Sequence, residues 1–71
     1  MNIKEFREAT KAEIAWEQHW LEKTEAILQK DYCQDPAKQK FIAPLHRMKR
    51  ILQKNIKVYE KVLEQISKES L

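Results

Sequence analysis

The sequence predicts an all-α protein, and three observations lead to this prediction. Glycine is absent and proline occurs only at Pro36 and Pro44, which leaves little material for the tight turns of β-hairpins. Glu, Lys, Gln, Ala, Leu and Ile are abundant, and all favour helices. Apolar residues in the second half recur at alternating steps of three and four. We therefore expect a single domain over residues 1–71, an antiparallel two-helix hairpin that pairs into a homodimeric four-helix bundle.

The first helix is expected over residues 2–30. Asn2 followed by Glu5 is typical of a capping box at a helix start. Apolar residues then continue at helical spacing as far as Leu28 and cover a broad face. Glu13 and Glu17 interrupt this face one turn apart, so the sequence places two carboxylates among apolar neighbours.

The connection is expected over residues 31–35 and the second helix over residues 36–67. Asp35 can cap the second helix, and Pro36 suits its first position, where a missing N–H costs nothing. Pro44 either kinks this helix or opens it after a short separate turn. We expect one helix that bends near residues 40–44.

The second helix carries a nearly unbroken heptad seam, in which Lys49 is the one charged residue. Its members are Ile42, Leu45, Lys49, Leu52, Ile56, Tyr59, Leu63 and Ile66. A second row lies beside this seam, so about half of the circumference is apolar, more than one partner helix covers. The second row consists of Phe41, Met48, Ile51, Asn55, Val58 and Val62.

A partner subunit is the expected source of additional stability. A chain of this length gains only about 3–5 kcal/mol from its own core. Because Cys33 is the single cysteine, an internal disulfide is excluded. The predicted interface, within the hairpin and between subunits, comprises Phe6, Ile14, Trp16, Trp20, Leu21, Met48, Leu52, Ile56, Tyr59 and Leu63.

The register of the hairpin or of the dimer is expected to depend on a pair of charges. A turn centred between Cys33 and Gln34 would place Glu17 beside Lys49, with Glu13 near Asn55 as a second polar contact. A charge at a seam position destabilises a helix pair unless it is paired, but the pairing can select one alignment. We therefore predict that Glu17 and Lys49 form the register pair.

Charge is divided unevenly along the chain. Residues 1–35 carry five basic and eight acidic side chains, and residues 36–71 carry nine basic and three acidic ones. One interpretation is a polyanion-binding stripe that contains Arg47, Arg50, Lys54 and Lys57. The other is a solvated face whose field is offset by the acidic first helix. The net charge of only +3 and the lack of a nucleic-acid-binding motif favour the second, with at most weak binding near physiological salt.

No catalytic or metal-binding pattern emerges from the sequence. His19 and His46 lack the spacing of metal ligands and are expected at the surface, and Cys33 is expected to be unreactive. We therefore expect no enzyme and no cofactor. No apolar run is long enough to span a bilayer, so we expect a cytoplasmic protein without membrane contact.

The outline, with its Gln34-Asp35-Pro36 turn and broad apolar face, resembles small helical-hairpin proteins such as Rop-type plasmid copy-number regulators and type III secretion co-chaperones. The resemblance is architectural and includes no binding motif. We predict a protein–protein interaction module, a small adaptor, regulator or chaperone-like hairpin that binds itself and another protein. A nucleic-acid-binding regulator is the alternative.

Overall fold

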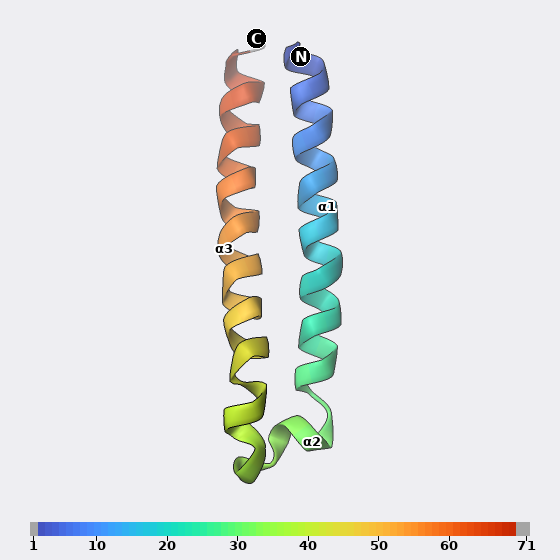
Figure 1. Cartoon of the computed structure of the whole chain (residues 1–71). Helices are drawn as coiled ribbons and strands as arrows, with labels where there is room; N and C mark the ends of the chain where they lie inside the picture. Colours follow the sequence, from blue (N-terminus) through green and yellow to red (C-terminus); the bar gives the residue numbers. More distant parts are fainter. Residues whose placement is uncertain (1, 70–71) are drawn as a thin grey trace.

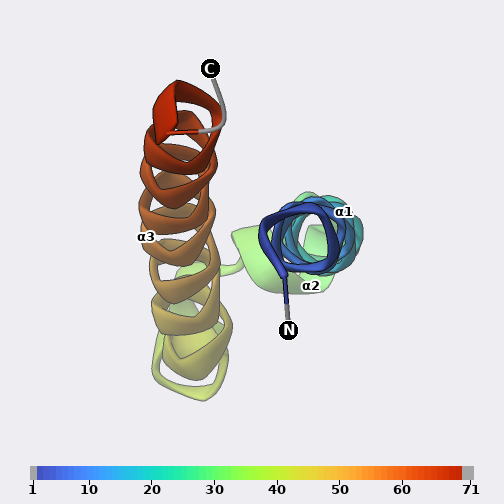
Figure 2. The same cartoon turned by 90° about the horizontal axis from the view of Figure 1, so that it is seen from above.

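The computed structural model describes residues 2–69, which form four helical elements. These are α1 (Ile3–Leu28), α2 (Asp31–Gln34), the 3₁₀ turn η1 (Pro36–Lys38) and α3 (Gln39–Glu69). No strand occurs among the described residues, so the all-α prediction is confirmed. The two long helices lie side by side and run in opposite directions, joined at one end by α2 and η1 (Figure 1). Seen from the end where the two termini lie, α3 is inclined to α1 (Figure 2).

The predicted cap is formed at the start of α1. Asn2 has an extended backbone, and its side-chain Oδ1 accepts a hydrogen bond of 2.8 Å from the backbone N–H of Glu5. The Asn2 amide also donates to the Glu5 carboxylate at 3.4 Å. These contacts satisfy one of the backbone donors that the first helical turn leaves open.

The connection between the long helices differs from the predicted loop. Residues 31–34 form α2, and α3 begins at Gln39 rather than at residue 36. Asp35 does act as a cap, because its side chain accepts from the backbone N–H of Ala37 at 2.9 Å, but the element it caps is η1. The connection is therefore longer than a five-residue loop.

Two glutamines hold the connection against the helix ends. Gln34 donates from Nε2 to the carbonyl of Leu28 at 2.7 Å. Gln39 donates from Nε2 to the carbonyls of Cys33 and Asp35 at 3.2 and 3.1 Å. The carbonyls of Leu28 and Cys33 lie in the last turns of α1 and α2, where a helix leaves carbonyls without their usual partner. The carbonyl of Asp35 also accepts from the backbone N–H of Lys38 at 3.0 Å.

Pro44 lies inside α3, which continues through it to Glu69. The proline is in the second helical turn, where it removes the N–H that would reach the carbonyl of Lys40. The alternative in which Pro44 opens the helix is wrong.

The core is a single seam between α1 and α3. On α3 it uses the predicted heptad, with Ile42, Leu52, Ile56 and Ile66 buried and the other seam residues half-buried. On α1 the buried residues are Thr10, Thr24 and Leu28. Both threonine hydroxyls donate to carbonyls of their own helix, Thr10 to Phe6 at 2.8 Å and Thr24 to Trp20 at 2.7 Å. The burial of these hydroxyls is therefore satisfied within α1.

The molecule is a thin rod rather than a sphere. Its extents are 53 × 16 × 14 Å, and its radius of gyration is 16.2 Å. A compact domain of this length would have a radius of gyration of about 11 Å. In the described chain the seam thus consists of one row of side chains from each long helix, and no third long helix packs against it.

The predicted register is corrected by two contacts across the seam. Lys49 Nζ lies 3.8 Å from Glu25 Oε2, and the Thr24 hydroxyl lies 3.6 Å from Met48 Sδ. The partner of Lys49 is therefore about two helical turns from the predicted Glu17. The helical connection shifts the facing residues by about one heptad, which keeps both seams in contact but changes which residues lie opposite each other.

We predict that double-mutant cycles will distinguish the two registers. Glu25→Gln with Lys49→Gln should give a coupling free energy of about 0.5 kcal/mol, because the pair is only partly shielded from water. Glu17→Gln with Lys49→Gln, the matched cycle, should give a coupling near zero. Urea unfolding measures both cycles, and a larger coupling for Glu17 would contradict this register.

We also predict that Gln34→Ala will lower the free energy of unfolding by about 1 kcal/mol, because it removes the donor to the Leu28 carbonyl. Gln18→Ala is the control, since Gln18 is exposed on α1 and the same chemical group is removed. Chemical denaturation at one protein concentration measures both variants. Equal destabilisation by the two would show that the Gln34 contact does not stabilise the connection.

Candidate interaction surface

Large apolar side chains are exposed along both long helices. Among residues 2–69, ten are exposed whereas six apolar side chains are buried. Eight of the ten define a surface that we call the apolar face: Phe6, Trp16, Trp20, Ile27, Phe41, Met48, Ile51 and Val58. A protein this small seldom exposes so many large apolar side chains without a partner.

The eight residues belong to one side of the molecule. Each precedes a seam position by one residue, as Trp20 precedes Leu21 on α1 and Ile51 precedes Leu52 on α3. One residue corresponds to a rotation of about 100° around a helix. Because α1 and α3 run in opposite directions, the same rotation from their shared seam leads to the same side (Figure 1). The contact of Met48 with Thr24 agrees with this placement, whereas Lys49 and Glu25 meet toward the opposite side.

Three aromatic rings form a cluster near the middle of α1. Trp16 and Trp20 meet edge to face at 5.7 Å between ring centroids, and His19 lies 5.6 Å from Trp20 and 6.3 Å from Trp16. Trp16 is nevertheless 57% exposed. Exposed tryptophans that are held by their neighbours present apolar area at low entropic cost, a property of interface hot spots.

Four polar residues interrupt the same rows, Glu13 and Lys23 on α1 and Asn55 and Gln65 on α3. Glu13 and Asn55 are both half-buried, and Glu13 precedes the seam residue Ile14 as Asn55 precedes Ile56. The predicted contact between them is not formed, since neither takes part in a hydrogen bond or ion pair within the described residues. They therefore present unused hydrogen-bonding groups beside the apolar face.

The predicted interface residues divide into two groups. Leu52 and Ile56 are buried, and Ile14, Leu21, Tyr59 and Leu63 are half-buried in the seam between α1 and α3. Phe6, Trp16, Trp20 and Met48 are exposed on the apolar face. The predicted interface did not include Ile27, Phe41, Ile51 and Val58, which are exposed on the apolar face as well. Their position one residue before the seam is the sequence signal that groups them with the other members of this face.

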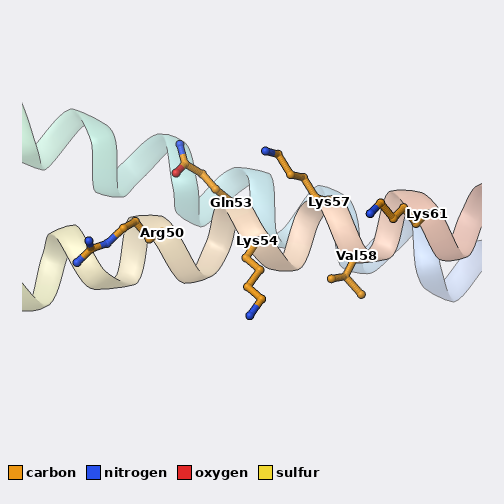
Figure 3. Close-up of a pocket in the computed structure, with 6 residues that line it drawn as sticks. All are labelled: Arg50, Gln53, Lys54, Lys57, Val58 and Lys61. Carbon is orange, nitrogen blue, oxygen red and sulfur yellow. The ribbon is translucent and has the colours of Figure 1, made fainter.

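The predicted polyanion-binding residues are all exposed on α3. Arg50, Lys54 and Lys57, together with Gln53, Val58 and Lys61, line a shallow groove of about 430 Å³ on this helix. Their charged ends spread apart along the helix (Figure 3). Arg47 precedes them on α3 and is exposed as well.

Other candidate groups are placed as follows. His19 and His46 are exposed, and Cys33 is 7% exposed within α2. In the described part of the chain no three His, Cys, Asp or Glu side chains gather into a possible metal site. None of the described helices combines the length and apolar character needed to cross a bilayer. Comparisons with protein-family models, curated proteins and solved structures find no match to this chain.

Proposed function

We propose that the chain is a non-enzymatic protein–protein interaction module that pairs with a second copy through the apolar face to form a four-helix bundle. The observation that carries this proposal is the set of large apolar side chains exposed on the same side of both long helices. Two copies placed face to face would give each long helix a second apolar neighbour, as in bundles of four helices. Each helix would then bury both of its apolar rows.

The exposed area of the chain supports a second copy as the occupant of the apolar face. The accessible surface is 5703 Å², whereas a compact monomer of 8.6 kDa exposes about 4,700 Å². The excess of about 1,000 Å² per chain corresponds to about 2,000 Å² for two chains, the size of a stable interface. Because the area extends along the rod, a second copy, which has the same length, can cover it.

The polar residues beside the apolar face would give the pairing a defined alignment. A polar side chain at an otherwise apolar interface disfavours alignments in which it stays unpaired. Glu13 and Asn55 have no partner within the described chain, so a second copy can supply one. The bundle would thereby favour a single register over arrangements shifted along the helices.

We predict a mass of twice 8.6 kDa in solution at micromolar concentration. Light scattering after gel filtration measures this mass. Because association stabilises the folded state by mass action, the melting temperature should also rise with protein concentration. A monomer that is fully helical and melts cooperatively, with a melting temperature independent of concentration, would contradict the proposal.

Two pairs of substitutions locate the interface. Trp16→Glu and Ile51→Glu place a charge on the apolar face and should weaken the dimer at least 10-fold. Gln18→Glu and Gln53→Glu are matched controls, two residues further along the same helices, at exposed positions outside the apolar face. Sedimentation equilibrium measures all four dissociation constants. Equal weakening by the controls would place the interface elsewhere.

A further inference from the structure

A second surface of α3 remains outside both the seam and the apolar face. It carries a row of five exposed cations, which we call the basic stripe: Arg47, Arg50, Lys54, Lys57 and Lys61. The steps between them alternate between three and four residues, so the five stay on one flank of the helix. At 1.5 Å per residue the stripe is about 21 Å long.

The structure does not neutralise the basic stripe. The acidic first helix was expected to offset it, but the ion pair between α1 and α3 in the described chain uses Lys49 and Glu25, outside the stripe. None of the five stripe residues forms an ion pair with a described carboxylate. Of the acids of α3, Glu64 and Glu69 lie beyond the stripe. Glu60 lies between Lys57 and Lys61 but is within ion-pair distance of neither.

The position of the stripe explains why the charges are not compensated. Lys54 lies two residues from both Leu52 and Ile56, which is about half a turn from the seam. Its side chain therefore extends from the part of α3 farthest from α1. The acidic residues of α1 lie across the seam and do not reach these cations.

The chemistry of the stripe fits regularly spaced phosphates. Its groove is lined by four cations, Gln53 and Val58, and no aromatic ring contributes to that lining (Figure 3). Proteins that hold unpaired bases provide aromatic side chains for stacking. Proteins that hold a duplex by its backbone require only cations and polar groups along its surface.

We propose that the basic stripe of α3 binds the phosphate backbone of double-stranded nucleic acid without selecting a base sequence. The binding is electrostatic, so it weakens as salt increases, and its dissociation constant lies at about 10⁻⁴ to 10⁻⁶ M near physiological salt. A single copy suffices, because the stripe lies on one helix. In a dimer formed through the apolar face, both stripes stay exposed.

The salt dependence provides the quantitative test. Five phosphate contacts give a slope of about −4.5 for the logarithm of the binding constant against the logarithm of salt concentration. The affinity for a random-sequence DNA duplex of about 20 base pairs should therefore fall about 500-fold between 50 and 200 mM salt. Fluorescence anisotropy of a labelled duplex measures this change.

Matched substitutions separate the stripe from the overall charge. Arg50→Gln with Lys54→Gln should reduce the slope to about −2.7, because two phosphate contacts are lost. Lys4→Gln with Lys11→Gln removes the same charge from exposed positions on α1 and should leave the slope unchanged. Arg47→Gln with Lys57→Gln is a second stripe variant, and circular dichroism verifies that each variant keeps its helices.

Three outcomes would overturn the proposal. One is the lack of saturable duplex binding at 50 mM salt, and another is an equal reduction of the slope by the α1 variant. The third is binding of the unlabelled single strand or of polyglutamate as tightly as the duplex, since that would identify an unpaired strand or an acidic protein as the partner. Retained duplex preference with a reduced slope in both stripe variants supports it.

Discussion

The seam between α1 and α3 is the contact on which the rest of the structure depends. It is formed by one row of side chains from each helix, and even its most buried aliphatic residue, Ile42, remains 2% exposed. Two of the buried positions on α1 are threonines whose hydroxyls bond within their own helix. Such a seam aligns two helices but encloses few side chains completely, and a large part of the apolar surface stays in contact with water.

This shortage of enclosed core explains the character of the outer surfaces. A helix that packs against one neighbour buries a narrow stripe, whereas α1 and α3 each carry a broader apolar sector. The surplus sectors lie on the same side because α1 and α3 run in opposite directions. The polar side, where Lys49 meets Glu25, is left for solvent. The antiparallel arrangement of two amphipathic helices thus gives a rod with an apolar side and a polar side.

The sequence was sufficient to predict the helical class, the seam of α3 and the cap at Asn2, since each depends on residues close together in the chain. The register was not predictable in the same way. A heptad pattern repeats every seven residues, so it defines which face of a helix is buried but accepts shifts by a whole heptad. The length of the connection chooses among these shifts. Residues 31–38 fold into α2 and η1. The Asp35 cap is local and was predicted, whereas the bonds of Gln34 and Gln39 to Leu28 and Cys33 depend on the folded helix ends.

Around α3 the seam, the apolar face and the basic stripe occupy separate sectors, and residues such as His46, Gln53 and Glu60 lie on the remaining polar side. Val58 is at a border, because it belongs to the apolar face and also lines the groove. No other residue of α3 belongs to two of these sectors. Successive substitutions on one sector can therefore create a contact with a new partner while the residues of the other sectors are retained. Each surface of the helix can evolve separately.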